Sequence, residues 1–463
     1  MTDEIIKKIW TLSPLVEVRE SYQELLQLTD ELIRVYDLQN RLSHDPFDST
    51  RARIVSLPFD RINNELKGST CIVTGGYGCV GTILVNELLK FDVKTIIILD
   101  NKNNTEFSSS SKVNSINCDV RDLERVLDIF SFYKPNFVFH TAAQRDPGFA
   151  ENNIVETVST NVTGTLNIVK ACEATGSVKQ MVFSSTGKAS RYFTEEVYAA
   201  TKKICEFILD TYARESVVRY SMVRFTHILD NSLMNAELKN ASENDSYVAV
   251  HSPGKYVTAQ NAKEAAYLML NALVYSTMKQ CNFLLVRYLE WPVESLEMAL
   301  FHIKQTGRHI PVAFVGNPIG YCEKFFRGQM DWSKPDDLNL LINVYEQKYR
   351  QLNADEDIII SRVCPTQSTT LARVVDSIDQ TKGEAQMKSA VIDGLKELVK
   401  GSLKMVNNAE TINILRWGLD PGFLEMENKR VDDFDILVPL LKESLAEQVV
   451  KNRKLEALIY NSL

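Results

Sequence analysis

The sequence lacks any apolar run long enough to cross a bilayer, which takes roughly 18 residues in a helix. It also lacks the apolar core of a secretory signal after its acidic first residues. Both absences argue against secretion and against insertion into a membrane. We therefore expect a cytoplasmic protein without a membrane span.

The eight cysteines are scattered, with no Cys-x-x-Cys pair and no His/Cys cluster at metal-ligand spacing. Disulfide frameworks and structural zinc sites both need such groupings, so we expect reduced cysteines and no metal. Dense Lys/Arg clusters are lacking too, and 52 basic against 60 acidic side chains give a formal net charge of −8. This charge argues against a nucleic-acid partner.

What the chain does contain is a glycine-rich turn. Gly75, Gly78 and Gly81 lie between an apolar run at 71–73 and a helical run at 82–90. Glycines at this spacing permit a tight turn, let the backbone approach a pyrophosphate and let the next helix pack on the strand. A second apolar run, 95–99, follows the helical run. The next residue is Asp100, an acid at the position where a ribose hydroxyl would lie. The turn therefore predicts a dinucleotide site.

Strand-like and helix-like segments alternate from about residue 67. The expected strands are 71–73, 95–99, 116–119, 137–140 and 180–184, and the expected helices are 80–90, 122–133 and 156–175. This alternation is typical of an α/β fold with a doubly wound (Rossmann) parallel sheet.

The two ends of the chain have a different, helical pattern. In the N-terminal arm, 1–66, apolar residues fall at heptad-like spacing, namely Leu25, Leu28, Leu32, Val35 and Leu42. They suit either a dimerisation helix or a helix packed on its own core. A C-terminal helical region is expected at 331–463. The middle region, 67–330, would hold the cofactor domain and a small substrate-binding subdomain.

Side chains able to do redox chemistry follow the fifth expected strand. Thr186 ends that strand, and Tyr198 and Lys202 are four residues apart on an expected helix. Because this spacing puts both on one helix face, the ammonium can lower the pKa of the phenol and hold a nicotinamide ribose. With the Thr186 hydroxyl, they can move a proton while a hydride moves.

In these segments the chain resembles the extended short-chain dehydrogenase/reductases, and more narrowly the polysaccharide-biosynthesis family of nucleotide-sugar 4,6-dehydratases. The likeness covers roughly 67–330 and is carried, in the family's order, by Cys118–Asp122, His140–Ala143, Thr160–Thr165, Ser185–Ala189, Tyr198–Lys202, Val223–Phe225 and Ile310–Gly316. It implies an NAD(P)-dependent enzyme of polysaccharide or glycoconjugate biosynthesis that transiently oxidises C4 of a nucleotide sugar. Family habit also implies a homo-oligomer.

The resemblance implies roles for individual residues. The implied catalytic residues are Thr186, Lys188 (the base), Tyr198 and Lys202. The implied cofactor-binding residues are Gly75, Tyr77, Gly78, Cys79, Val80, Gly81, Asp100, Asp119, Val120, Ala142, Ala143, Asn161, Tyr198 and Lys202. The implied substrate-binding residues are Arg145, Lys188 and Lys255, the last standing where the family has an arginine against the diphosphate.

Two acidic residues bear on the cofactor. Asp100 favours NAD, because a carboxylate accepts both ribose hydroxyls and repels a 2′-phosphate, while Lys102 keeps NADP open. Asp119 would meet adenine, or would instead cap the helix that starts at Leu123. We expect His140, at the end of its strand, to be a packed core histidine.

The chain departs from the family at the general acid. The family's Asp, which protonates the departing C6 oxygen, is Gly187 here. Loss of a positioned acid typically costs roughly a hundredfold to ten-thousandfold in rate, so dehydration would need Glu195, Glu196 or a water instead. Epimerisation beside a C4 ketone needs no such acid. A dehydrogenase or ketoreductase of a specialised pathway, and a cofactor-binding scaffold without catalysis, are the alternatives.

Overall fold

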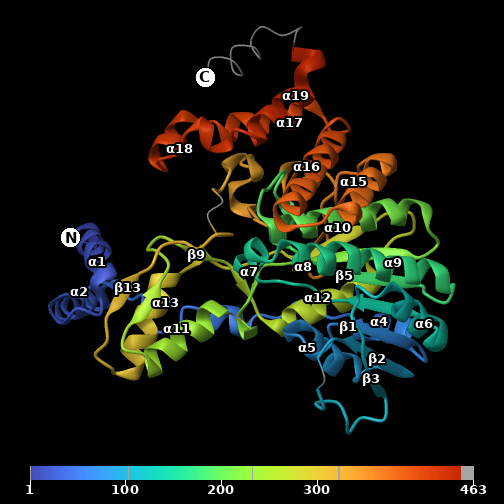
Figure 1. The fold of residues 1–463 in the computed structure, drawn as a ribbon, viewed down its shortest axis with the longest axis horizontal. Helices are drawn as coiled ribbons and strands as arrows, with labels where there is room; N and C mark the ends of the chain where they lie inside the picture. The colour runs from blue at the N-terminus through green and yellow to red at the C-terminus, as the bar shows by residue number, and fades with distance from the viewer. Residues whose placement is uncertain (1, 103, 232, 322–323, 450–463) are drawn as a thin grey trace. The chain divides into compact units, whose positions relative to one another are not determined.

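The computed structural model describes residues 2–102, 104–231, 233–321 and 324–449, and the chain divides into two compact units (Figure 1). Unit 1 comprises Met1–Ile54, Thr226–Ala265 and Tyr288–Cys322, and unit 2 comprises Val55–Phe225, Ala266–Arg287 and Glu323–Leu463. This division differs from the three consecutive regions expected from the sequence. The N-terminal helices join the middle segments of unit 1, and the C-terminal region joins the sheet of unit 2.

In the described residues, unit 2 is built on a nine-stranded sheet with the order β14-β15-β11-β6-β5-β4-β1-β2-β3. The strands are β1 (Thr70–Thr74), β2 (Thr95–Asp100), β3 (Val113–Asn117), β4 (Phe137–His140), β5 (Gln180–Thr186), β6 (Arg219–Phe225), β11 (Asn282–Val286), β14 (Gln351–Leu352) and β15 (Ile358–Arg362). From β3 to β11 all neighbours are parallel, whereas β15 is antiparallel to both β11 and β14.

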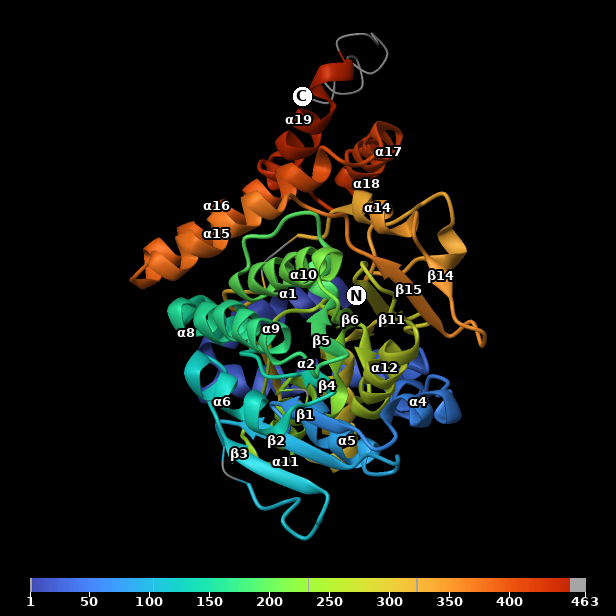
Figure 2. The ribbon, with the colours of Figure 1, turned by 90° about the vertical axis from the view of Figure 1, so that its right-hand side faces the viewer.

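Helices cover both faces of this sheet, with α10 and α12 on opposite sides (Figure 2). They are α4 (Phe59–Leu66), α5 (Cys79–Leu88), α6 (Leu123–Tyr133), α7 (Pro147–Asn152), α8 (Ile154–Val158), α9 (Gly164–Thr175), α10 (Val197–Glu215) and α12 (Ala262–Val274). The central strands β1, β4 and β5 are buried along their whole length, as parallel strands covered on both faces must be. The expected doubly wound α/β fold is confirmed.

The third strand lies earlier than expected. The sequence predicts 116–119, but β3 runs from Val113 to Asn117, paired with β2 from Ile96↔Val113 to Asp100↔Asn117. As the outermost strand it is largely exposed, so its residues need not be apolar. Pairing with β2, rather than its own hydrophobic pattern, therefore decides its bounds.

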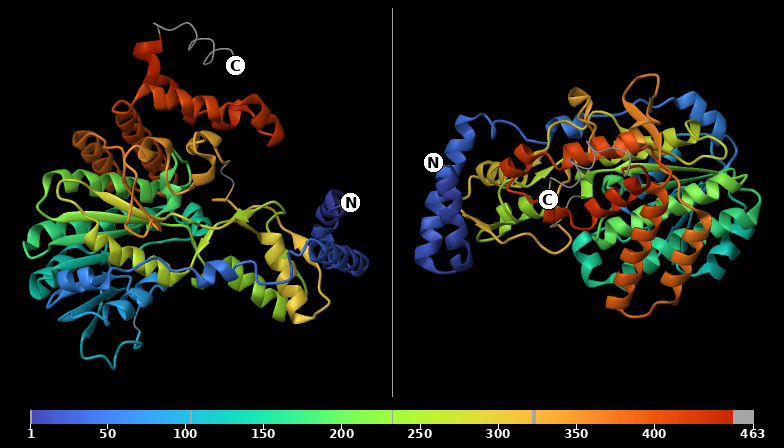
Figure 3. Two further views of the ribbon diagram at one scale, coloured as in Figure 1. Left: turned by 180° about the vertical axis from the view of Figure 1, so that it is seen from behind. Right: turned by 90° about the horizontal axis from the view of Figure 1, so that it is seen from above.

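The C-terminal region is not wholly helical, which corrects the expectation for 331–463. Three consecutive β-branched residues, Ile358 to Ile360, are buried in β15 against β11. The helices of this region are α14 (Val344–Gln347), α15 (Ser368–Gln380), α16 (Glu384–Leu403), α17 (Asn408–Gly418), α18 (Pro421–Met426) and α19 (Leu437–Val449). α15 and α16 form a hairpin, drawn in orange in Figure 3. α16 packs on α10 and α8.

Unit 1 contains helices and short paired strands. They are α1 (Thr2–Leu12), α2 (Arg19–Leu38), α3 (Asp48–Ala52), β7 (His227–Ile228), α11 (Leu233–Asn244), β8 (Val248–Val250), β9 (Tyr256–Val257), β10 (Ala259–Gln260), β12 (Val293–Glu294), α13 (Ser295–Thr306) and β13 (Val312–Phe314). Leu25, Leu28, Leu32 and Leu42 belong to the same buried cluster as Leu296. The heptad-like leucines thus pack on their own core, as the second of the two readings predicts.

Three features are absent from the described residues. No helix there is long and apolar enough to cross a membrane. None of their seven cysteines is in a disulfide. No group of three or more His, Cys, Asp or Glu side chains among them is arranged to hold a metal ion.

Candidate active site

The glycine turn joins β1 to α5 at the carboxyl end of β1. Gly75 has a φ of +66°, and a Cβ there would lie 2.7 Å from the backbone nitrogen of Ala142, in the loop after β4. A Cβ at Gly81 would overlap the carbonyl oxygen of Gly75. Only glycine fits both positions, because the turn folds back on itself and on the neighbouring loop. The first N–H groups of α5, from Cys79 and Val80, follow directly.

Asp100 is buried at the end of β2 and braces the same turn. Its carboxylate accepts hydrogen bonds from the backbone N–H groups of Tyr77 and Lys102, both at 3.0 Å. Each carboxylate oxygen can accept a second hydrogen bond, so the group remains able to receive ribose hydroxyls. The tight cradle at Gly75 and Gly81, with this acid beside it, fits a dinucleotide.

Asp119 does not cap the helix that follows it; its side chain binds Arg121 instead. Its carboxylate pairs with the guanidinium of Arg121 at 2.5 Å, and this hydrogen bonding lowers the pKa of Asp119. Asp122 instead caps α6, by accepting from the N–H of Arg125 at 3.0 Å. The cap interpretation of Asp119 is therefore wrong. Val120, between them, is buried.

The loop after β4 is held from behind by Asn161. This side chain, in a π-helical turn at Ser159–Thr163, accepts from the N–H of Gln144 at 2.8 Å and donates to its carbonyl at 3.0 Å. The two bonds fix the backbone of the loop that presses on the glycine turn. Ala142 and Ala143 in this loop are half-buried, and Arg145 is exposed.

His140 is a neutral core histidine, which confirms the expectation. Its two ring nitrogens lie 2.7 Å from the Thr74 hydroxyl and 2.9 Å from the Thr165 hydroxyl. Complete burial, helped by the nearby ammonium of Lys202, lowers the pKa of His140 to about 3. It therefore carries no charge at neutral pH and ties β4 to β1 and α9.

Thr186, Tyr198 and Lys202 lie at the junction of β5 and α10. Lys202 is buried, and its Nζ donates to the carbonyl of Ser184 at 2.9 Å and lies 4.6 Å from the centre of the Phe183 ring. Burial lowers the pKa of Lys202 to about 8. Tyr198, half-buried, is one turn earlier on α10, and Thr186 ends β5 two residues beyond Ser184. The bond between Lys202 and Ser184 thus brings the three predicted groups to the same end of the sheet.

Lys188 forms an ion pair with Glu196. The other carboxylate oxygen of Glu196, which is buried, accepts from the guanidinium of Arg191 at 3.1 Å. Both oxygens of Glu196 are therefore engaged with cations. Glu195, the other substitute considered for the missing acid, is exposed.

Leu341, a residue that sequence reasoning missed, packs against Gly187. A Cβ on Gly187 would overlap the Cδ2 atom of Leu341, which is buried. The backbone of Leu341 is fixed on both sides: its N–H donates to Asn339 Oδ1 at 2.9 Å, and its carbonyl accepts from Arg224 Nη1 at 2.9 Å. An aliphatic side chain therefore fills the space where the family's acid would stand.

Arg224, which holds Leu341, is the centre of a buried charge cluster. It is fully buried and pairs with Glu206 of α10 and Glu346 of α14, each at 2.7 Å. Its guanidinium also lies 3.9 Å from the centre of the Phe283 ring. The C-terminal segment is thus anchored to the centre of the sheet beside the predicted site.

The remaining predicted substrate residue, Lys255, belongs to unit 1. Its ammonium lies 3.5 Å from the carbonyl of Tyr321.

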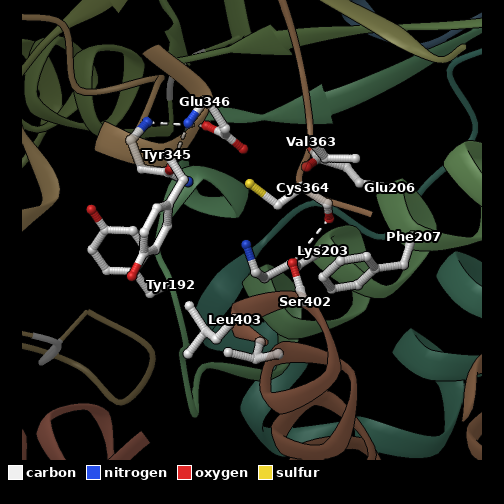
Figure 4. A pocket seen from close by; sticks show the side chains of 12 residues that line it. Tyr192, Lys203, Glu206, Phe207, Tyr345, Glu346, Val363, Cys364, Ser402 and Leu403 are labelled. Atoms are coloured by element: carbon white, nitrogen blue, oxygen red, sulfur yellow. Dashed lines mark hydrogen bonds between the residues drawn. The ribbon is translucent and has the colours of Figure 1, made fainter. Parts of the chain in front are cut away.

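A small cavity lies between α10, α14 and α16, and Figure 4 shows its lining. Lys203 and Cys364 face it, and burial lowers the pKa of Lys203 and raises that of Cys364. None of the predicted catalytic, cofactor or substrate residues lines this cavity. It is therefore separate from the predicted active site.

The fold is the doubly wound α/β fold expected of an extended short-chain dehydrogenase/reductase. More narrowly, the chain belongs to the polysaccharide biosynthesis protein family, which matches residues 71–316. The resemblance to the polysaccharide-biosynthesis family identified from the sequence motifs is thereby confirmed.

Individual proteins show the same likeness. The capsular polysaccharide biosynthesis protein CapD of Staphylococcus aureus is 25% identical over 342 residues, 67% of this chain and 55% of CapD. A UDP-N-acetylglucosamine 4,6-dehydratase (inverting) of Campylobacter jejuni is 35% identical over 142 residues, 29% of this chain and 41% of that enzyme. The X-ray structure of Pen from Bacillus thuringiensis has the same fold, with a TM-score of 0.55 and 21% identity over 64% of this chain and 87% of Pen. The chain spans about half the length of the curated relatives it matches.

Proposed function

We propose that this chain inverts C4 of a nucleotide sugar through a transient C4 ketone, with NAD as the bound cofactor. The observation that carries the proposal is the contact of Gly187 with Leu341. Elimination of the C6 oxygen needs a proton donor at this place, and a buried leucine occupies it. Inversion at C4 needs no donor at C6, and the groups that it does need are present.

Each step rests on residues of this chain. The cradle at Gly75 and Gly81 holds the pyrophosphate of the dinucleotide, and Asp100 receives the ribose hydroxyls. When bound, the nicotinamide supplies a reversible hydride acceptor. Tyr198 takes the proton of the C4 hydroxyl, and Thr186 hydrogen-bonds that hydroxyl.

Lys202 stabilises the Tyr198 phenolate. Only one of its three N–H donors is used by the Ser184 carbonyl. The other two donors would be available to the phenolate and to a nicotinamide ribose.

The reaction balances without another reactant. With a nicotinamide bound, the hydride taken from C4 would return to the opposite face of the same carbon, while Tyr198 takes the hydroxyl proton and gives it back to the oxygen. No C–H bond at C5 breaks, so Lys188 can remain paired with Glu196 and bind substrate. No cofactor is consumed.

The test is to incubate the purified protein in D2O with UDP-, GDP- and dTDP-sugars and to analyse products by mass spectrometry and NMR. We expect a C4 epimer of unchanged mass with no carbon-bound deuterium. Incorporation of one deuterium at C5 would show that Lys188 acts as a base and would overturn the C4 route. Loss of water would show a dehydratase, and a net change in nicotinamide absorbance would show a dehydrogenase or ketoreductase. No product from any sugar nucleotide would favour the scaffold reading.

Restoring the missing acid should restore dehydration. Gly187→Asp alone forces its side chain into Leu341, and such overpacking costs about 1–3 kcal/mol of unfolding free energy. Elimination also needs Lys188 to leave Glu196 and take the C5 proton. With Leu341→Ala making room for the acid, the double variant should then eliminate water roughly a hundredfold faster than the wild type. Mass spectrometry of the product measures this. Leu341→Ala alone is the control and should not dehydrate; equal dehydration by the wild type would contradict the role assigned to this contact.

Two sequence-based expectations stay predictions. One is a homo-oligomer, which sedimentation of the purified protein would measure, and the other is a cytoplasmic location.

A further inference from the structure

The first turn of α10, which carries Tyr198, lacks a cap from its own N-terminal residue. The preceding residue, Glu196, makes no side-chain cap bond, because its carboxylate is held by Lys188 and Arg191. The first N–H groups of a helix need acceptors from elsewhere when they are not capped locally. The orientation of this turn therefore depends on groups outside α10.

Glu151, near the end of α7, supplies the acceptor. Its Oε1 accepts from the N–H of Val197 at 2.8 Å, one residue before Tyr198. The side chain of Glu151 is only 4% exposed, so the bond is sheltered from water. A carboxylate at a helix N-terminus is favoured both by the hydrogen bond and by the helix dipole.

The other oxygen of Glu151 is bound by the helical hairpin of the C-terminal region. Lys388 of α16 donates to Glu151 Oε2 at 2.7 Å. One turn earlier, Glu384 accepts from the N–H groups of Ile154 and Val155 at 2.6 and 3.1 Å. The start of α16 thus forms hydrogen bonds with both α7 and the first turn of α8.

We propose that Glu151 is a positioning residue for Tyr198 and that Lys388 fixes Glu151, which makes the α15–α16 hairpin part of the active-site framework. This inference rests on the proposed function, since it assumes that Tyr198 transfers the proton. The physical reason is that a shift of the first turn of α10 moves the phenol relative to the C4 hydroxyl. Displacements of about 1 Å at a reacting group can cost on the order of a hundredfold in rate.

Lys388→Met keeps the side-chain stem and removes the ammonium. We expect kcat to fall roughly ten- to a hundredfold, with KM for the sugar nucleotide within about twofold, because substrate contacts are untouched. Lys388→Arg should restore kcat. Glu151→Gln, which keeps a backbone acceptor but loses the charge that holds Lys388, should lower kcat as well.

Lys400→Met is the matched control. Lys400 is on the same helix, is 41% exposed against 42% for Lys388, and pairs with Glu443 away from α7. Hydrogen exchange of the amides at 197–200 gives a readout independent of turnover, and it should be faster in Lys388→Met than in Lys400→Met.

Two results separate the inference from the proposed function. If Tyr198→Phe leaves turnover intact, the proposed function fails. If Tyr198→Phe is inactive while Lys388→Met matches Lys400→Met in kcat or in amide exchange, the positioning role is overturned and the proposed function stands.

Discussion

Replacing Arg224 with Met is expected to lower the free energy of unfolding by about 3–5 kcal/mol. The substitution leaves Glu206 and Glu346 buried without the guanidinium that joins them. It also frees the carbonyl of Leu341, which Arg224 holds at 2.9 Å. Urea unfolding followed by circular dichroism measures the change.

Arg373→Met is the control for this prediction. Arg373 pairs with Glu397 at 3.3 Å on the surface, with both side chains more than half exposed. Its loss should cost about 0–1 kcal/mol, because exposed ion pairs contribute little. An equally small effect of Arg224→Met would contradict the role of the buried cluster as the anchor of the C-terminal segment.

The largest effect on activity is expected from Tyr198→Phe, with turnover falling roughly a hundredfold to ten-thousandfold. In the proposed mechanism the phenol of Tyr198 exchanges a proton with the C4 hydroxyl, and the substitution removes only the phenol oxygen while keeping the ring. Product formation from the sugar nucleotide identified in the D2O experiment measures the loss, and mass analysis of denatured protein checks that the bound cofactor is unchanged.

Tyr212→Phe is the matched control, because Tyr212 is a half-buried tyrosine on the same helix, against Tyr220. Its turnover should equal that of the wild type. Equal activity of both variants would remove Tyr198 from the mechanism.

Most of the cofactor half of the fold could be predicted from the sequence, because its signals are local. The glycine turn is predicted by the spacing of Gly75 and Gly81. The strands β1, β2, β4 and β5 are each predicted by a short apolar run in their own sequence. Tyr198 and Lys202 could be placed on one helix face by spacing alone. Two local predictions were wrong by a few residues. The third strand was expected at 116–119 but runs from Val113 to Asn117. Asp119 was considered as the cap of α6, but both Asp119 and Asp122 precede this helix, and only the backbone geometry selects Asp122.

The features that were missed depend on contacts between distant parts of the chain. β15 lies within a mainly helical pattern, and it is a strand because β11 offers it an edge. Nothing in the sequence pairs Leu341 with Gly187, or Lys388 with Glu151. The sequence suggested Glu196 as a substitute for the missing acid, but its pairing with both Lys188 and Arg191 depends on the folded loop.

The antiparallel pairing of β15 with β11 has a consequence for synthesis. A nascent chain that has just completed β11 presents an unpaired strand edge until β15 emerges. Translation from Val286 to Arg362 takes about 4–15 s at typical rates, which is long compared with the formation of helices and hairpins. Until Glu346 has also been synthesised, Arg224 can pair with Glu206 alone. The sheet is therefore completed late, and until β15 is made the edge of β11 is open to pairing with a strand of another chain.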